Sequence, residues 1–355
     1  MAIPSELLEN EIISDWKVEK QIETFQGQTG GFFSRGYIVE KGGKKAFLKA
    51  MDLHSVLGGS LQQVNEAISQ YEFERKLFEM CARSGLSNIV RMLDQGEHIP
   101  SSIAHLPNPQ FNKVYYLIFE FASGGDIRRE LKFDGEKLDS WKLFVLHQIA
   151  VALKQLHTIG IAHQDIKPSN VLAFKEEKKY KLTDLGRSSS TNYIAPTDDI
   201  PFPGDLKYSP PEYFYRYIPP EYNDRRIGSD LYLLGSMISF LYTGLGALNL
   251  TRIFTSQEYW WGIWGGSYKD VLPFLIDAHA KATEALREKL VGNKFQNELA
   301  LIYHQLCHPD PSLRGHPKTR AMSNHLGLER YVTDFDRYSK DLEITERIRR
   351  LASGN

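Results

Sequence analysis

Four polar side chains on short turns between apolar runs are the residues of this sequence best suited to chemistry. Asp165, Lys167 and Asn170 share one turn, and Asp184 ends a short alternating run further along the chain. A fold that brings them together would form an oxygen-rich pocket with one cation. Such a pocket suits Mg²⁺ carrying a phosphate chain, because proteins hold Mg²⁺ with one or two carboxylates plus phosphate oxygens. A polar turn with a structural asparagine cap is the alternative, since short motifs also match by chance.

A lysine and a glutamate upstream form a second candidate pair. Lys49 ends an apolar run that follows a Gly-Gly turn, so we expect it at the end of a hairpin strand. The apolar spacing over residues 61–81 predicts a helix. Glu74 falls within its apolar stripe, between Tyr71 and Phe78. Because a carboxylate on a core-facing stripe is costly without a cation, we expect Glu74 to pair with Lys49. A solvated Glu74 on a partly exposed stripe is the alternative.

Two of these segments resemble a known family. The run His-Gln-Asp-Ile-Lys-Pro-Ser-Asn at residues 163–170, followed by Asp-Leu-Gly at 184–186, resembles the catalytic loop and the metal-binding loop of protein kinases. Further matching segments keep the family order over roughly residues 20–320. The sequence is therefore similar to the eukaryotic-like (Hanks-type) serine/threonine protein kinases. This resemblance implies an α+β, protein-kinase-like two-lobed fold, with a small sheet-rich lobe and a larger, mainly helical lobe.

The same resemblance implies the domain organisation. We expect an N-terminal extension over residues 1–18 and a small lobe over 19–121. A large lobe would follow over 122–325, and a charged helical tail over 326–355. The turn-rich connector after the apolar run 114–121 would be the hinge between the lobes.

The resemblance also assigns roles to the candidate catalytic residues. Asp165 would accept the proton of the attacking hydroxyl, and Lys167 would neutralise the transferring phosphoryl group. Asn170 and Asp184 would hold Mg²⁺. Since a lysine follows the catalytic aspartate by two residues, the resemblance favours serine or threonine over tyrosine as the acceptor.

The nucleotide contacts follow from the resemblance as well. Lys49, paired with Glu74, would contact the phosphates of ATP. The remaining residues implied to bind the nucleotide are Gly27, Gly30, Gly31, Ile38, Glu120, Ala122 and Asp126.

The glycine-rich segment departs from the family pattern. Glycines let backbone N–H groups close over phosphates because no Cβ blocks the approach. Here either Phe33 replaces the third glycine, or the loop is longer and ends at Gly36. Phe47 stands where the family has a small alanine against the adenine ring. A plain flexible hairpin tip is the alternative to a nucleotide lid.

Two further departures concern regulation and substrate alignment. Gln164 replaces the arginine that grips a phosphorylated activation loop in the family, so we expect that switch to be missing or altered. Asp205 replaces a threonine that helps to hold the catalytic aspartate and lysine. An acid there either weakens substrate alignment or mimics a fixed negative charge. The hydroxyls at 188–193 either accept phosphate or solvate a loop.

A distant charged pair supports the family resemblance. Glu212 closes the segment that resembles the end of an activation loop, and Arg314 lies far downstream in a segment whose arginine pairs with that glutamate in the family. We expect a buried bidentate pair, the geometry in which arginine outperforms lysine. Two independent solvated charges are the alternative.

Composition narrows the class of protein. The chain has 355 residues, of which 42% are apolar and 25% charged, as in ordinary globular proteins. A net charge of −1 argues against a dedicated nucleic-acid binder. Its two cysteines, Cys81 and Cys307, lack metal-ligand spacing and are expected to be reduced core residues. The start shows no basic segment followed by an apolar one, so we expect no secretory signal and a cytoplasmic location.

An uncharged stretch at residues 231–250 is long enough for a membrane span, but its hydroxyls and glycines favour a buried helix of the large lobe. We therefore expect no membrane span. Trp260, Trp261 and Trp264 form a cluster that either marks a partner surface or covers the core.

The sequence thus predicts an ATP- and Mg²⁺-dependent kinase acting on a protein substrate. Two alternatives remain open: a catalytically weak, nucleotide-binding interaction protein of the same shape, and a small-molecule phosphotransferase of related fold. The Glu212 and Arg314 segments argue against the second alternative.

Overall fold

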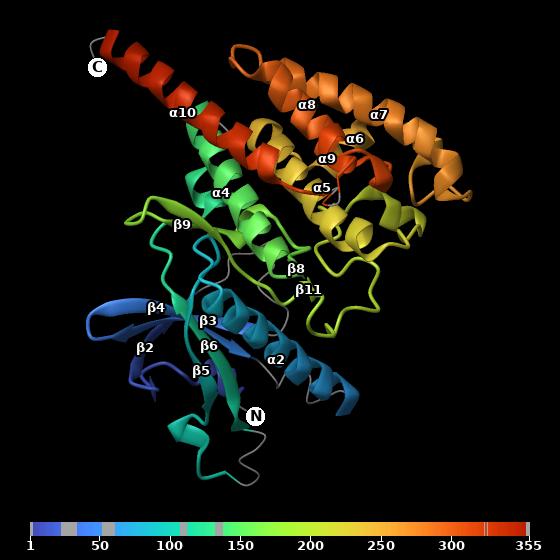
Figure 1. The fold of residues 1–355 in the computed structure, drawn as a ribbon. Helices are drawn as coiled ribbons and strands as arrows, with labels where there is room; N and C mark the ends of the chain where they lie inside the picture. Colours follow the sequence, from blue (N-terminus) through green and yellow to red (C-terminus); the bar gives the residue numbers. More distant parts are fainter. Residues whose placement is uncertain are drawn as a thin grey trace.

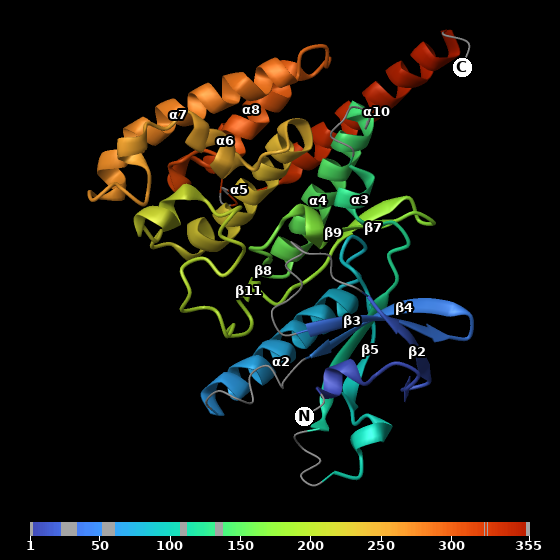
Figure 2. The ribbon, with the colours of Figure 1, turned by 180° about the vertical axis from the view of Figure 1, so that it is seen from behind.

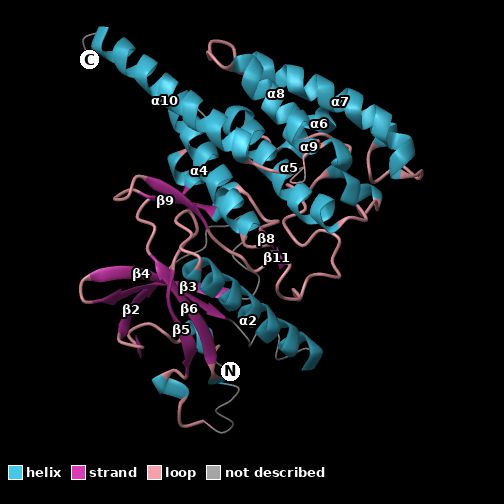
Figure 3. Ribbon diagram, viewed as in Figure 1, coloured by secondary structure: helices cyan, strands magenta, loops and turns pink. Residues whose placement is uncertain are grey.

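The computed structural model describes residues 3–22, 34–51, 61–106, 112–131, 138–322, 324 and 326–352. A sheet-rich lobe built from the first part of the chain lies beside a larger helical lobe built from the rest (Figures 1 and 3). This is the predicted two-lobed α+β architecture.

A six-stranded antiparallel sheet forms the small lobe. In spatial order its strands are β1 (Ile12–Ile13), β2 (Trp16–Gln21), β3 (Ser34–Lys41), β4 (Lys44–Met51), β6 (Val114–Glu120) and β5 (Met92–His98). The predicted hairpin is β3–β4, and its turn glycines Gly42 and Gly43 have φ angles of +58° and +76°. These left-handed conformations suit glycine, which explains the Gly-Gly pair.

The sheet begins before the expected boundary between residues 18 and 19. Alternating apolar residues of β2, Trp16 and Val18, are buried, as the period of a strand requires. Together with Leu8 and Ile13 they pack against the face of the sheet that carries Tyr37. The segment treated as an extension in the sequence therefore supplies part of this lobe's core.

Helix α2 (Leu61–Arg83) carries the predicted apolar stripe of the small lobe. Tyr71, Leu77 and Phe78 are buried in the main core of the molecule. The Phe78 ring meets that of Phe119 on β6 edge-on, with 4.8 Å between the centroids. This packing fixes which face of α2 points toward the sheet and the large lobe.

The large lobe is helical. Its α-helices are α3 (Ile127–Glu130), α4 (Asp139–Thr158), α5 (Tyr222–Thr243), α6 (Ala247–Ile253), α7 (Tyr268–Lys289), α8 (Gln296–Leu306), α9 (Pro317–Arg320) and α10 (Glu329–Ala352). Short 3-10 turns occur in both lobes. Those of the small lobe are Pro4–Glu6 and Ser101–Ile103, and those of the large lobe are Pro168–Asn170, Pro211–Tyr215, Gln257–Tyr259 and Pro311–Leu313.

Helix α5 lies in the centre of the large lobe. Its residues from Gly228 to Ser239 are buried, so the first part of the uncharged stretch is a core helix, as expected. The helix ends at Gly244, whose φ is +78°, and α6 begins in a new direction. None of the described helices alone combines the length and hydropathy of a membrane span. Only α5 and α6 together do, as a pair bent by 67°.

Short strands carry the loops that hold the candidate catalytic residues. Strands β7 (Gly125–Asp126), β9 (Val171–Phe174) and β10 (Lys179–Leu182) form one antiparallel sheet. Strands β8 (Ile161–Ala162) and β11 (Ser189–Ser190) form a second. Because the turn 163–170 lies between β8 and β9, and Asp184 follows β10, both turns are anchored at each end by pairing.

Helix α10 is the predicted charged C-terminal helix, and it lies along α4 (Figures 1 and 2). Its first half buries Tyr331, Phe335, Tyr338 and Leu342 in the core of the large lobe. Its last turns extend away from the rest of the protein (Figure 2). The tail is therefore partly a structural element of the lobe.

Candidate active site

The turn after β8 is held in place by a buried carboxylate of α5. Asp230 accepts hydrogen bonds from the backbone N–H of His163 (2.8 Å) and of Gln164 (2.6 Å). The same carboxylate lies 2.8 Å from Nε2 of His157 at the end of α4. Gln164 has a positive φ of 62°, which turns the chain sharply before Asp165. Two helices thus set the position of the candidate catalytic aspartate.

Asp165 lies at the centre of a compact polar cluster. The Lys167 ammonium is 3.0 Å from Asp165 Oδ2, and Asn170 Nδ2 donates to the same oxygen at 3.0 Å. The backbone N–H of Asp205 donates to Asp165 Oδ1 at 2.8 Å. Burial raises the pKa of Asp165, although the Lys167 charge opposes this. A carboxylate with a raised pKa is better suited to accept a proton.

Lys49 joins the two lobes electrostatically. Its ammonium lies 2.8 and 2.9 Å from the two Glu74 oxygens on α2, and 3.3 Å from Asp184 Oδ1 in the large lobe. The contact predicted from the helix stripe is therefore present. Burial opposes the charged lysine, but Asp184 and Glu74 outweigh it and raise the pKa of Lys49. In turn, the Lys49 charge lowers the pKa of Asp184, whereas burial raises that of Glu74.

Asn170 and Asp184 supply the donor set expected for Mg²⁺. Asn170 directs its amide N–H₂ to the backbone carbonyl and carboxylate of Asp165, so its carbonyl oxygen, which also accepts a long hydrogen bond from Ser169 Oγ at 3.4 Å, is the atom that could bind a metal. The charge of Lys49 lowers the pKa of Asp184 and so favours its carboxylate form. Across the part of the chain that the structure describes, no group of three or more His, Cys, Asp or Glu side chains could hold a metal. One carboxylate and one amide fit Mg²⁺ that takes its other ligands from phosphates and water.

Two apolar side chains lie on the strand face that also carries Lys49. Ile38 on β3 pairs in register with Phe47 on β4, and both point away from the core face that buries Tyr37 and Val39. The Phe47 ring covers Gly36 so closely that a Cβ there would lie 2.7 Å from it. Gly27, Gly30 and Gly31 lie outside the described residues, so the glycine lid stays a prediction.

The hinge residues hold side-chain contacts that sequence reasoning missed. Glu120 binds the ammonium of Lys181 on β10 at 2.8 Å, and it also accepts the backbone N–H of Arg91 at 2.8 Å. Lys181 is almost fully buried. Alternation within β10 predicts only that one face is buried; nothing local to Lys181 indicates a glutamate partner on the hinge.

Asp126 is occupied by a near neighbour. Its carboxylate caps α3 by accepting the Arg128 N–H, and it forms a two-point ion pair with the Arg128 guanidinium, both at 2.9 Å. The spacing of two residues on a short helix was the available signal for this pair. Contact between Asp126 and a ribose therefore stays a prediction, as does adenine recognition by backbone groups at Glu120 and Ala122.

The segment between Asp184 and Glu212 is anchored at its far end. Arg314 donates to both oxygens of Glu212 at 2.7 and 2.6 Å, and neither side chain is exposed. This is the bidentate pair that the sequence predicts. Within the segment, Ser188, Ser189 and Ser190 are buried, whereas Thr191 and Tyr193 are exposed. Only the latter two of these hydroxyls are accessible to modification.

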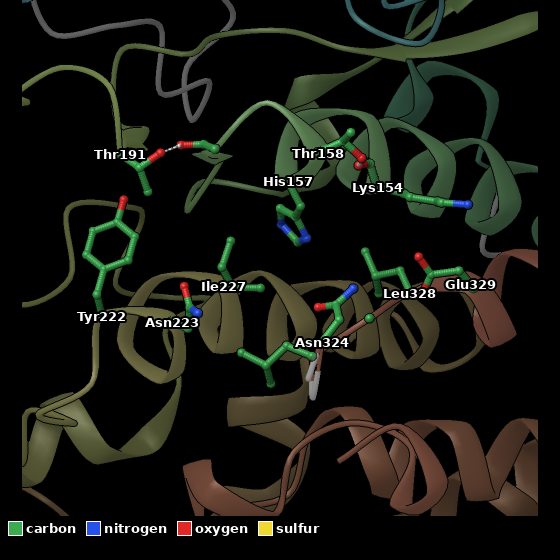
Figure 4. A pocket seen from close by; sticks show the side chains of 13 residues that line it. Lys154, His157, Thr158, Thr191, Tyr222, Asn223, Ile227, Asn324, Leu328 and Glu329 are labelled. Carbon is green, nitrogen blue, oxygen red and sulfur yellow. Dashed lines mark hydrogen bonds between the residues drawn. The ribbon is translucent and has the colours of Figure 1, made fainter. Parts of the chain in front are cut away.

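A separate cavity of about 230 Å³ lies between the end of α4, the start of α5 and the segment before α10 (Figure 4). His157, Thr191, Tyr222, Asn223 and Asn324 line it. It contains none of the residues around Lys49 and Asp184, and is therefore distinct from the candidate nucleotide site.

The three clustered tryptophans are half-buried and serve the lobe itself. Trp260 and Trp261 flank the Arg252 guanidinium, with ring centroids at 4.3 and 4.9 Å. Trp264 Nε1 donates to the carbonyl of Ser267. These contacts match the core-covering alternative and give the predicted partner surface no specific support.

Comparison with known proteins agrees with this geometry. Residues 54–319 match the family described as Protein kinase domain. This chain belongs to the protein kinase family. The fold class and the family predicted from the sequence are therefore confirmed.

Relatives of this protein kinase chain include proteins named as serine/threonine-protein kinases. It is 31% identical over 151 residues to the serine/threonine-protein kinase ELM1 of Saccharomyces cerevisiae, covering 39% of this chain and 22% of the relative. It is 30% identical over 141 residues to an Aurora kinase of Debaryomyces hansenii, covering 37% and 32%. The probable serine/threonine-protein kinase PknB of Lactococcus lactis is 26% identical over 180 residues, covering 51% and 25%. The matched part of this kinase chain thus spans a third or less of these relatives.

Proposed function

We propose that this chain transfers the γ-phosphoryl group of ATP to serine or threonine hydroxyls of a protein substrate, with Mg²⁺ as cofactor. The observation that carries the proposal is the lysine held between two carboxylates. Lys49 from β4 is bound by Glu74 of the same lobe and by Asp184 of the other. Phosphoryl transfer depends mainly on positioning and charge neutralisation, which such a network supplies.

Lys49 is assigned to the phosphates of the nucleotide. Glu74 fixes its ammonium through two contacts at 2.8 and 2.9 Å, so the charge is positioned before the substrate arrives. Asn170 and Asp184 would hold Mg²⁺, which supplies neutralisation of the phosphate charge when bound. Ile38 and Phe47 form the apolar wall available to the adenine ring.

Asp165 is assigned to the acceptor hydroxyl. Asp205 N–H and Asn170 Nδ2 hold its two oxygens in place, and burial raises its pKa, so that it accepts the hydroxyl proton. Lys167, 3.0 Å from Asp165, would carry positive charge to the transferring phosphoryl group. This lysine and the names of the curated relatives support serine or threonine as the acceptor.

The test is phosphate incorporation from radiolabelled ATP into a generic protein substrate and into the chain itself. Asp165→Asn should lower kcat at least about 100-fold, because the positioned base is lost, while ATP–Mg²⁺ binding stays within about twofold. Asp277→Asn, an exposed acid on α7, is the matched control and should keep wild-type activity. Wild-type rates in Asp165→Asn would refute the assignment.

A further inference from the structure

Arg226, in the second turn of α5, is one of the two largest fully buried side chains of the described residues. It is 1% exposed. Its Nη1 donates to Gln164 Oε1 at 2.9 Å. Gln164 directly precedes the catalytic aspartate, Asp165, in the sequence. Its Nη2 donates to the Asp198 carbonyl at 2.9 Å. One guanidinium therefore joins the turn 163–170 to the segment between Asp184 and Glu212, called the activation segment below.

Two more carbonyls of the segment complete the contact. Arg226 Nη1 lies 3.2 Å from the Ile200 carbonyl and 3.4 Å from that of Pro201. The guanidinium thus binds three backbone carbonyls within four consecutive residues. A planar, multi-donor group suits such a set of acceptors better than an ammonium does.

The charge of Arg226 is not neutralised by a close carboxylate. The Asp198 carboxylate is 3.9 Å away, at the limit of an ion pair. Burial lowers the pKa of Arg226, and the neighbouring charge of Arg225 adds to this. A buried cation without a close counter-charge is costly, so carbonyl dipoles must hold it. Its position is therefore explained by the carbonyls it binds.

The held segment leads directly to the catalytic residues. Gly204 packs onto the Gln164 carbonyl so closely that a Cβ there would lie 2.0 Å from the oxygen. The next residue, Asp205, donates its N–H to Asp165 Oδ1 at 2.8 Å. Its carboxylate lies 3.6 Å from the Lys167 ammonium. Arg226 thus acts on Asp165 through both sides: through Gln164 in the turn and through residues 198–205 in the segment.

We propose that Arg226 is a positioning residue that fixes the activation segment from the interior, so that Asp205 orients Asp165 without a phosphate group on the segment. The proposal rests on the proposed kinase function. It also explains the departure at Gln164: the side chain at this position accepts a hydrogen bond from an internal arginine. An arginine there would instead place a second guanidinium against Arg226.

The kinetic test compares Arg226→Met with Arg226→Lys and with Arg225→Met. Arg226→Met should lower kcat about 10- to 100-fold, because small displacements of catalytic groups have effects of this size, and should leave the KM for ATP within about twofold. Arg226→Lys keeps the charge but loses the planar guanidinium with its several N–H donors, so its kcat should lie between those of Arg226→Met and the wild type. Arg225→Met, whose guanidinium contacts the Pro219 carbonyl outside the segment, should match the wild type. Equal kcat values for Arg226→Met and the wild type would refute the proposal.

Hydrogen exchange gives a readout independent of activity. The backbone amides of the non-proline residues within 198–205 should exchange at least about tenfold faster in Arg226→Met than in the wild type. In Arg225→Met their exchange rates should be unchanged. If no transfer occurs in the wild type but exchange rises as stated, the kinase function fails and the positioning role stands. If Asp165→Asn abolishes transfer but Arg226→Met changes neither exchange nor kcat, the positioning role fails alone.

Dephosphorylation tests the remaining part of the proposal. Protein treated with a broad-specificity phosphatase, and shown by intact mass to carry no phosphate, should keep its initial activity within about twofold. A loss of more than about tenfold would mean that a phosphate holds the segment, and the proposal would be wrong. If Arg226→Met does not fold, Gln164→Ala removes one of the acceptors and should change kcat and exchange in the same direction, by less.

Discussion

Two buried arginines hold the segment between Asp184 and Glu212 by different means, Arg226 at its middle and Arg314 at its far end. Arg314 meets a carboxylate, with Glu212 at 2.7 and 2.6 Å, and burial of the guanidinium is outweighed by that carboxylate, which raises its pKa. Arg226 meets an amide and carbonyls, and burial lowers its pKa. The same type of side chain, buried at both places, is thus a closely neutralised pair at Glu212 and, at residues 198–201, a cation whose counter-charge on Asp198 lies 3.9 Å away.

The two kinds of contact are expected to have different consequences: one for the stability of the large lobe, the other for the position of the segment. A buried ion pair is strongly coupled, because removal of either partner leaves an unpaired charge in the interior. A guanidinium on carbonyls of an otherwise exposed loop leaves groups that water can satisfy once the arginine is removed. We therefore expect Glu212–Arg314 to govern whether the large lobe folds, and Arg226 to govern where the segment lies.

The largest expected effect is at the neutralised pair. Glu212→Gln should destabilise the protein by about 3–5 kcal/mol, because it leaves Arg314 charged and unpaired where neither side chain is exposed. Urea unfolding followed by circular dichroism measures the change. The double variant Glu212→Gln/Arg314→Met serves as the control and should lose less than Glu212→Gln alone. A double variant that is less stable than the single one would contradict the view of Arg314 as a paired charge.

The second expected effect is a pH dependence near Arg314. His279 is 1% exposed and stacks on His304, with 5.1 Å between the ring centroids; His308 lies at 6.3 Å. Burial, followed by the neighbouring histidines and Arg314, lowers the pKa of His279 to about 3. The folded protein therefore disfavours the protonated ring. Its contribution to stability is complete above the unfolded pKa of about 6.5 and is lost as the pH falls toward 3.

Unfolding free energies at pH 7 and pH 5 test this dependence. The His279 linkage should remove on the order of 2 kcal/mol between the two pH values. His279→Gln should lose correspondingly less over the same interval. His105→Gln, at an exposed position of the small lobe, should lose as much as the wild type. Identical pH profiles for His279→Gln and the wild type would show that this ring does not titrate on unfolding.

The smallest expected effect on stability is at Arg226. Arg226→Met should lower the unfolding free energy by only about 1 kcal/mol, because removal of a buried charge with only a 3.9 Å ion pair offsets part of the lost hydrogen bonding. The same urea series measures it. A loss as large as that of Glu212→Gln would show that Arg226 is a structural brace like Arg314, and would remove the contrast between them.

Much of the candidate site was predictable because charged residues occur there in sequence contexts where charge is unusual, such as the apolar stripe of a helix. A glutamate on an apolar helix stripe requires a cation, and this reasoning selects Glu74 and its contact with Lys49. The turn 163–170 and Asp184 combine carboxylates, a lysine and an amide at the spacing found in the catalytic and metal-binding loops that they resemble. The Glu212–Arg314 pair follows from the same family resemblance, although a hundred residues separate its members.

Other contacts could not be predicted, because their partners carry no sequence signal. Lys181 and Glu120 meet only because β10 packs beneath the hinge. Residues 12–13 and 16–18 join the small lobe through strand pairing and Leu8 through core packing, whereas the sequence alone predicted an extension over residues 1–18. Asp126 is bound by Arg128 through the local geometry of a four-residue helix.

By itself, the sequence determined the family, the two-lobed architecture and the chemically competent side chains, because those depend on residue type and spacing. Only the tertiary structure decided what Arg226 does. Its acceptors are mainly backbone carbonyls, which every residue of the chain possesses. Since any segment offers such acceptors, only folding selects the residues at 198–201 as the ones that reach this guanidinium.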